Sequence, residues 1–353
     1  MRDPAVRPTF TAPMNPVPDA VGVGVGVGVG RRRLLGAAAA LALPAGAWCA
    51  DERMPIGAAP VVPRAAPPFG RDPAPGRACA GLMCRPLGAA TVPVIGMGTW
   101  LSFDVADAAA LAERERVLQV FFAAGGRLID SSPMYGRAER VVGELLARMP
   151  AQAGALFSAT KLWSPFAAEG RRQHAESLRL WRLARLDLQQ VHNLLNTEAH
   201  LKTLREARER GELRYLGATT SHGRRHDELL ALMQREPLDA VQLSYNMADT
   251  SAGPVIDAAA ARGVAVIVNR PFDGGRLLQS LAGQPLPGWA TEIGCSHWPG
   301  ALLKWVVARA GITCAIPATG NALHMAENMS AARGALPDAA LRSRMLADVQ
   351  KLL

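Results

Sequence analysis

Short apolar runs alternate with helical patterns along most of the chain and recur about every 24–31 residues. Runs of this length between helical patterns predict βα units, and a closed ring of parallel strands leaves no sheet edge exposed. The sequence therefore predicts an α/β fold, an eight-stranded parallel (β/α)8 TIM barrel over residues 91–353. Its expected strands are Ile95–Trp100, Arg127–Ser131, Leu156–Lys161, Leu186–His192, Tyr215–Thr219, Ala240–Tyr245, Val264–Asn269 and Thr313–Pro317.

The second of these runs ends abruptly at an acid. Leu128 and Ile129 are followed by Asp130, by a polar turn that cannot continue a strand, and by Tyr135. After Gly136 the apolar positions take helical spacing. They are Val141, Val142, Leu145, Leu146 and Met149. In parallel α/β folds, binding and chemistry take place at the carboxyl ends of the strands, so Asp130 and Tyr135 are candidate site residues.

The longest interval precedes the last predicted strand. It contains the stretch Phe272–Trp298, which is rich in Gly and Pro. Such a stretch suits a loop that folds over a bound ligand, and it equally suits a surface insertion without a function. The sequence leaves both interpretations open.

The first part of the chain lacks apolar periodicity. Residues 1–30 are Pro-rich and end in a Val-Gly repeat, so they are predicted to be a disordered low-complexity tail. Residues 51–90 carry eight prolines and predict an extended linker. Cys79 and Cys84 lie in this linker. They are interpreted either as a small disulfide loop, if the protein reaches an oxidising compartment, or as two free thiols.

Residues 31–50 resemble a twin-arginine signal. Arg31-Arg32-Arg33-Leu34-Leu35 is followed by an Ala/Leu-rich run of about 15 residues and by small residues suited to cleavage, whereas a membrane span needs roughly 20 residues. We therefore expect export to the periplasm by the twin-arginine machinery, with no stable membrane span after signal removal. The alternative is a basic tail on a cytoplasmic enzyme.

Composition narrows the class of protein. A chain of 353 residues with 49% hydrophobic residues can bury a large core. The net charge of +9 does not indicate nucleic acid, because residues 1–90 hold ten Arg against five acids and no nucleic-acid motif is present. The five cysteines form no CxxC pairs, and His222 and His226 have no third ligand placed by the sequence, so no metal site is predicted.

Three segments together resemble the aldo-keto reductase family over roughly Thr91–Leu353. They are Asp130-x4-Tyr135-Gly136 followed by Glu139-x3-Gly143, then Thr160-Lys161-Leu162, and then Gln190-Val191-His192-Asn193. Each lies at the end of a predicted strand, and their order along the chain is that of the family. The resemblance implies an NAD(P)H-dependent enzyme that reduces an aldehyde or ketone to an alcohol.

Four residues receive catalytic roles from this resemblance. Hydride transfer to a carbonyl needs a proton donor at the oxygen, and Tyr135 is the expected general acid. Lys161 is expected to lower the phenol pKa from about 10, with Asp130 fixing the lysine. His192 is expected to orient the carbonyl oxygen by a hydrogen bond. Taken singly, these side chains equally suit a structural ion pair, a barrel-capping ring and a hydrogen-bonded core histidine.

The resemblance also implies cofactor contacts. Tyr245 is expected to stack on the nicotinamide ring, and Gln242 to hold its carboxamide. Thr219 and Thr220 stand where the family has a Ser-Asn pair: Thr219 keeps the hydroxyl, but Thr220 offers no amide. Ala318 and His324 replace the Lys and Arg that clamp a 2′-phosphate. NADP(H) is expected first and NAD(H) second. The expected contact residues are Gly98, Thr99, Trp100, Asp130, Asn193, Thr219, Gln242, Tyr245, Arg270, Pro271, Phe272, Gly274, Arg276, Thr319, Asn321, His324, Glu327 and Asn328.

Aromatic residues near the predicted loops favour an apolar or aromatic carbonyl substrate, with plain packing as the alternative. They are Trp100, Trp163, Phe272, Trp289 and Trp298. A second interpretation of the whole chain is a cofactor-binding, redox-sensing or partner-binding module with little turnover.

Overall fold

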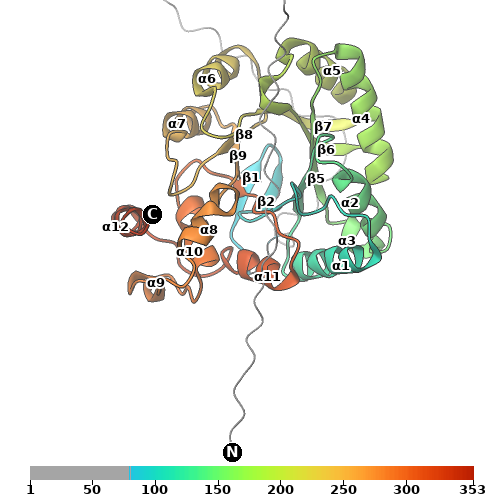
Figure 1. Cartoon of the computed structure of the whole chain (residues 1–353). Coiled ribbons are helices and arrows are strands. Elements are labelled where there is room, and N and C mark those ends of the chain that lie inside the picture. The colour runs from blue at the N-terminus through green and yellow to red at the C-terminus, as the bar shows by residue number, and fades with distance from the viewer. Residues whose placement is uncertain (1–78, 80) are drawn as a thin grey trace, which may run out of the picture. The chain divides into compact units, whose positions relative to one another are not determined.

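The computed structural model describes Cys79 and residues 81–353, and these form a barrel of eight parallel strands (Figure 1). Each strand pairs with the next along the chain, and parallel bridges join Ile95 to Ala315 and Gly98 to Ala318. The last strand thus returns beside the first, which confirms the predicted (β/α)8 TIM barrel. Its strands are β3 (Met97–Gly98), β4 (Leu128–Asp130), β5 (Phe157–Leu162), β6 (Leu186–Val191), β7 (Leu213–Thr219), β8 (Ala240–Ser244), β9 (Ala265–Asn269) and β10 (Cys314–Ala315).

Helices follow the strands and surround the barrel (Figure 1). None of the helices in residues 81–353 is both long and apolar enough to cross a bilayer. The α-helices are α1 (Ala108–Ala123), α2 (Ala138–Leu146), α3 (Pro150–Ala153), α4 (Ala167–Trp181), α5 (Thr197–Glu209), α6 (His226–Arg235), α7 (Gly253–Ala261), α8 (Arg276–Ser280), α9 (Trp289–Glu292), α10 (Trp298–Val307), α11 (Ala322–Ser330) and α12 (Ala339–Gln350). Two short 3-10 helices are η1 (His192–Leu194) and η2 (Asp273–Gly275).

The sequence did not predict the hairpin that precedes the barrel. Strands β1 (Cys84–Leu87) and β2 (Ala90–Pro93) pair antiparallel, so ordered structure begins before residue 91 and inside the expected linker. Leu87, Ala90 and Val92 join the apolar cluster of the barrel interior, which includes the first residues of several strands. The hairpin therefore covers the amino-terminal end of the barrel. The predicted tail 1–30, the signal 31–50 and linker residues 51–78 lie outside the described residues.

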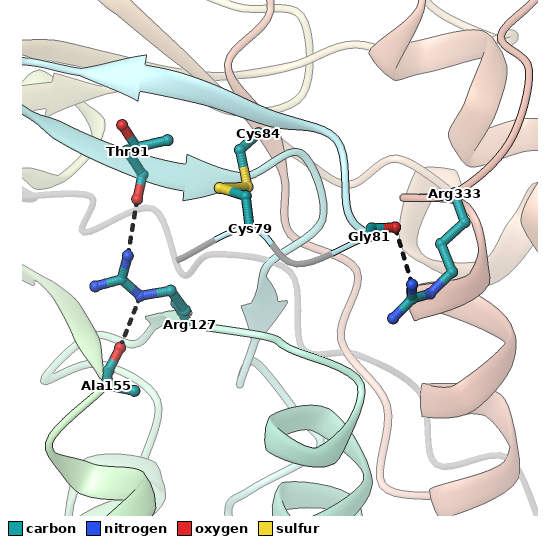
Figure 2. The surroundings of a disulfide bond; sticks show 7 residues. All are labelled: Cys79, Gly81, Cys84, Thr91, Arg127, Ala155 and Arg333. Carbon is teal, nitrogen blue, oxygen red and sulfur yellow. Dashed lines mark hydrogen bonds between the residues drawn. A yellow bond between two sulfur atoms is a disulfide. The ribbon is translucent and has the colours of Figure 1, made fainter. Parts of the chain in front are cut away.

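A disulfide joins Cys79 to Cys84 at the start of this hairpin (Figure 2). The disulfide was one of the two interpretations that the sequence left open. Arg127 donates to the carbonyl oxygens of Thr91 at 3.1 Å and Ala155 at 3.0 Å, which fastens β2 to the barrel. Arg333 donates to the carbonyl of Gly81 at 2.9 Å inside the disulfide loop. Arg127 and Arg333, which lie far apart in the sequence, thereby both hold the hairpin segment in place.

The interval Phe272–Trp298 is largely ordered by short helices. It contains η2, α8 and α9 and leads into α10. Trp289 is buried and its ring packs edge-on against that of Trp298, with centroids 6.0 Å apart. The first part of the interval borders the cavity described below, whereas these two tryptophans pack among the helices.

Helices α2 and α4 approach each other at a glycine. A Cβ at Gly143 would lie only 1.8 Å from the carbonyl oxygen of Leu180, so the backbones touch where no side chain fits. Helix α2 buries the apolar positions that the sequence assigned to one face, including Val142 and Leu145. Gly143 thus sets the distance between α2, which follows β4, and α4, which follows β5.

We expect Gly143→Ala to lower the free energy of unfolding by about 3 kcal/mol, because the added methyl group forces two backbones apart. The midpoint of thermal unfolding should fall by roughly 6–12 °C. Gly288→Ala is the matched control, since a Cβ there meets nothing within 4 Å and the residue has φ −55°. Thermal melts by circular dichroism that are equal for both variants would contradict this account.

Candidate active site

The turn after β4 carries the candidate proton donor. The Thr99 hydroxyl donates to the carbonyl oxygen of Asp130 at 3.0 Å, and its oxygen lies 2.9 Å from the hydroxyl oxygen of Ser131, which ties the loop after β3 to the end of β4. The Tyr135 amide then donates to the carbonyl of Ser132 at 3.0 Å. Gly136 completes the turn with φ +60°, where a Cβ would collide with the Asp104 carboxylate. The turn therefore holds Tyr135 at the carboxyl end of the barrel.

A buried ion pair lies beneath this turn. Lys161 on β5 is 0% exposed, and its Nζ lies 2.5 Å from Asp130 Oδ2 and 2.8 Å from the carbonyl oxygen of Ser131. Desolvation lowers the pKa of Lys161, but the nearby Asp130 and Tyr135 outweigh it and leave this pKa raised. Asp130 Oδ1 also accepts from Gln242 at 2.9 Å and Gln190 at 3.3 Å. Lys161 is therefore a fixed cation.

Tyr135 stands beside this cation. The Lys161 Nζ lies 5.0 Å from the centroid of the tyrosine ring. Burial raises the pKa of Tyr135, Lys161 lowers it, and the net result is above the usual value of 10.0. The sequence predicted that the ammonium would bring this pKa down toward neutrality. That expectation is corrected, because desolvation of the phenolate outweighs the attraction of Lys161.

His192 completes the group from the end of β6. Its ring meets that of Tyr135 edge-on, with centroids 5.9 Å apart and planes at 85°. Its Nδ1 lies 3.0 Å from the hydroxyl oxygen of Ser132. Burial, and then the charge of Lys161, lower the pKa of His192 to about 2. The imidazole is therefore neutral at physiological pH and can donate a hydrogen bond without acting as an acid.

These groups face a cavity of about 530 Å³ at the carboxyl end of the strands. A volume of this size is typical of small-molecule and cofactor sites. Lys161 stands behind Asp130 and does not line the cavity. The cavity walls contain many residues that the sequence assigned to the site: Gly98, Thr99, Trp100, Asp130, Tyr135, His192, Asn193, Gln242, Arg270, Pro271, Phe272, Gly274 and Thr319.

The structure places Tyr245 elsewhere. Side chains alternate along β8, so Gln242 and Ser244 face the barrel while the residue after them turns outward. The Tyr245 ring stacks on Trp305 of α10, with centroids 5.2 Å apart and planes at 11°. Its hydroxyl accepts from Arg342 at 3.2 Å. This position does not allow the predicted stacking on a nicotinamide ring, so the assignment of Tyr245 to the cofactor is corrected.

Thr219 binds a backbone group and does not line the cavity either. It is buried, and its hydroxyl accepts from the Asn193 amide at 2.9 Å. Asn193 lines the cavity and accepts from Ser221 at 3.1 Å. Thr219 therefore supports the loop that carries Asn193.

Arg276, another predicted contact, does not line the cavity. Its side chain is exposed and pairs with Asp273 at 2.7 Å.

Four predicted contacts belong to α11. Asn321 caps the helix, because its side chain accepts from the amides of Leu323 and His324. His324 is exposed, Glu327 is half-buried and Asn328 is buried, and none of them lines the cavity. The structure thus brings only the loop before α11, with Ala318, Thr319 and Gly320, to the cavity wall.

Several cavity residues escaped the sequence interpretation. Asn269 ends β9 and donates to Gln242 at 3.2 Å and to the carbonyl of Thr220 at 3.0 Å. Its place as the one polar residue at the end of an apolar strand was a usable signal. Arg114 gave no such signal, because it lies on α1 among other charged residues and reaches the cavity by donating to Ser102 and Gly320. Among the predicted aromatics, Trp100 and Phe272 line the cavity and Trp163 does not.

Comparison with known proteins gives the same architecture. An aldo-keto reductase from Bacillus halodurans, solved in its holo form, is 19% identical, with 77% of this chain and 96% of that chain covered and a TM-score of 0.63. A Klebsiella pneumoniae aldo/keto reductase in complex with NADP and acetate is 21% identical, with 74% and 92% covered and a TM-score of 0.61. A Bombyx mori aldo-keto reductase complexed with NADPH is 20% identical, with 76% and 88% covered and a TM-score of 0.63. No curated protein matches the chain.

At these identities the solved structures establish the fold alone. The family comparison reaches further, because the model of the Aldo/keto reductase family matches residues 94–343, well over half of the chain. That range contains the ion pair, the tyrosine and the histidine described above. The chain therefore belongs to the aldo/keto reductase family.

Proposed function

We propose that the protein reduces an aldehyde or ketone to the alcohol, with NADP(H) as the cofactor and Tyr135 as the general acid. Family membership supports a carbonyl-reducing oxidoreductase in general terms. The observation that carries the finer proposal is the buried Lys161–Asp130 pair, which stands behind Tyr135 and beside a neutral His192 at one cavity. Burying an ion pair costs free energy, and its position beside the Tyr135 phenol would allow the pair to stabilise a phenolate.

The cavity fits a dinucleotide. It is lined by Gly275, where the absent side chain lets a ligand approach the backbone, and by the basic side chains of Arg114 and Arg270. A Cβ at Gly275 would meet nothing within 4 Å, so that backbone is open. Related folds have been solved with NADP and NADPH bound. The cofactor, when bound, supplies the hydride.

The chain supplies the proton and the orientation. Tyr135 gives its phenolic proton to the substrate oxygen as negative charge develops there. Lys161 stabilises the phenolate that remains, and Asp130 holds the ammonium with help from Gln190 and Gln242. His192 is uncharged and donates a hydrogen bond to the same oxygen. Trp100, Leu101 and Met134 give the cavity an apolar wall, which favours an apolar carbonyl compound.

A cofactor-binding module with little turnover is the rival proposal. Both proposals expect NADPH to bind. They differ in a panel of aldehydes, ketones and quinones, because only the enzyme oxidises NADPH when a carbonyl compound is added. Binding without any turnover across the panel would favour the module.

Tyr135→Phe should lower kcat for carbonyl reduction at least about 100-fold, because the substrate oxygen loses its proton donor. NADPH binding, measured by fluorescence titration, should stay within about threefold of the wild-type value. Tyr245→Phe is the control, since it also removes one tyrosine hydroxyl but lies outside the cavity. If the Tyr135 variant keeps a tenth or more of wild-type turnover, the general acid is another group.

The pH dependence of reduction should follow the phenol. Burial keeps the pKa of Tyr135 above its usual value of 10.0, so the acid stays protonated through neutral pH. We expect kcat/KM for reduction to be flat between about pH 6 and 9 and to fall only above about pH 10. His192, with a pKa of about 2, should add no step near pH 6.5. Rate profiles with a midpoint near neutrality would contradict this assignment.

We also propose that the protein is exported through the twin-arginine pathway with its cofactor already bound. The support is the Arg31-Arg32-Arg33-Leu34-Leu35 motif, the Ala-rich run after it, and the disulfide between Cys79 and Cys84. Disulfides persist mainly in oxidising compartments such as the periplasm. A dinucleotide made inside the cell requires a route that carries folded proteins.

Replacing Arg31, Arg32 and Arg33 together by Lys should keep the full-length protein in the cytoplasm, because the export machinery no longer recognises the signal. Wild-type protein should appear in the periplasm in a shortened form that begins near residues 47–51. Arg53→Lys/Arg64→Lys is the control, since it makes the same change outside the motif. Cell fractionation that finds the wild-type protein and the triple-lysine variant both uncut in the cytoplasm would refute export.

A further inference from the structure

Ser132 lies between the candidate acid and the histidine. It is fully buried in the turn after β4, three residues before Tyr135. Its hydroxyl oxygen lies 3.0 Å from His192 Nδ1 and accepts from the Met134 amide at 3.3 Å. The serine therefore joins the turn that carries the phenol to the imidazole from the end of β6.

The contacts of this hydroxyl decide where its hydrogen points. A serine hydroxyl has one hydrogen to donate and two lone pairs to accept with. The Met134 amide already uses one lone pair. Among the described residues, His192 Nδ1 is the only other polar side-chain atom in hydrogen-bond contact with this oxygen, so the buried hydroxyl hydrogen has an acceptor only when it points at Nδ1.

An imidazole that accepts at Nδ1 carries its proton on Nε2. His192 is neutral, so it has one ring proton to place. Its Nε2 has no hydrogen-bond partner among the described residues, while the side chain lines the cavity. The proton is thereby available to a ligand oxygen and is not used inside the protein.

We propose that Ser132 is a positioning residue that fixes the Nε2–H tautomer of His192 and so makes the histidine a hydrogen-bond donor to the substrate oxygen. The proposal rests on the carbonyl reduction proposed above. With the opposite tautomer, Nε2 would present a lone pair to the carbonyl oxygen. Two acceptors would then face each other at the point where negative charge develops.

The sequence offers a matched control for the serine. Ser164 makes the same local turn, because its hydroxyl accepts from the amide two residues later, Phe166, at 3.0 Å. Ser164 is also buried, but it neither lines the cavity nor contacts His192. Ser132→Ala and Ser164→Ala therefore remove equivalent turn hydrogen bonds, and only the first removes the partner of the imidazole.

The test combines a spectroscopic and a kinetic measurement. Two-bond ¹H–¹⁵N correlation spectra of ¹⁵N-histidine-labelled protein report the tautomer of each ring, and His192→Gln identifies the His192 signals among those of seven histidines. We expect the Nε2–H pattern in the wild-type protein and in Ser164→Ala. In Ser132→Ala we expect a mixed or Nδ1–H pattern and a fall of about 10- to 100-fold in kcat/KM for a carbonyl substrate, with NADPH binding unchanged.

The outcomes separate this proposal from the proposed function. An Nδ1–H pattern in the wild-type protein, or an unchanged Nε2–H pattern in Ser132→Ala, overturns the role of Ser132 even if the enzyme is active. An equal loss of kcat/KM in both serine variants also overturns it, because the cause would then be the turn. If the wild-type protein reduces no carbonyl compound, the proposed function fails, and the spectra still decide the tautomer.

Discussion

The ion pair between Lys161 and Asp130 is the interaction on which the arrangement of the site depends. Removing a lysine from water costs several kcal/mol unless an opposite charge and hydrogen bonds replace the solvent, and Lys161 is 0% exposed. The replacement comes from four strands, because Asp130 on β4 binds Lys161 on β5, Gln190 on β6 and Gln242 on β8. A shift of β4 or β5 would separate the two charges, and a shift of β6 or β8 would remove a hydrogen bond from Asp130, so the pair favours one register of the barrel where the cavity opens.

The two ends of the barrel have different roles: the amino-terminal end holds apolar packing, and the carboxyl end holds the candidate site. Apolar residues fill the amino-terminal end, where the β1–β2 hairpin closes the interior. Polar and charged side chains occupy the carboxyl end, where each can find partners on neighbouring strands. The Asp130 pair is tolerated there because the glutamines and backbone carbonyls around it satisfy its hydrogen bonds. The same charges placed among the residues of the apolar layer would have no such partners.

The sequence predicted those features that local pattern determines. All eight strands were found as apolar runs, and the rule that chemistry lies at strand ends brought Asp130, Tyr135 and His192 together correctly in space. The hairpin was missed, because its prolines and the polar residues before it matched the composition of a linker. Tyr245 was misplaced because its burial depends on Trp305, 60 positions further along the chain (residue 305 minus 245), and no local pattern reveals that partner. The pKa of Tyr135 was misjudged for a related reason, since burial is a property of the folded cavity.

Burial and the charge of Lys161 together set the protonation states of Tyr135 and His192. Both Tyr135 and His192 lie close to the Lys161 ammonium, and a cation disfavours a second positive charge while it favours a phenolate. Burial opposes the charged form of either group. For the histidine the two effects act in the same direction, so its pKa falls to about 2 and the imidazole is uncharged at neutral pH. For the tyrosine they oppose each other, burial prevails, and the phenol keeps its proton at neutral pH. In the reduction that we propose, this environment separates the two roles: Tyr135 is the proton donor, and His192 orients the carbonyl oxygen.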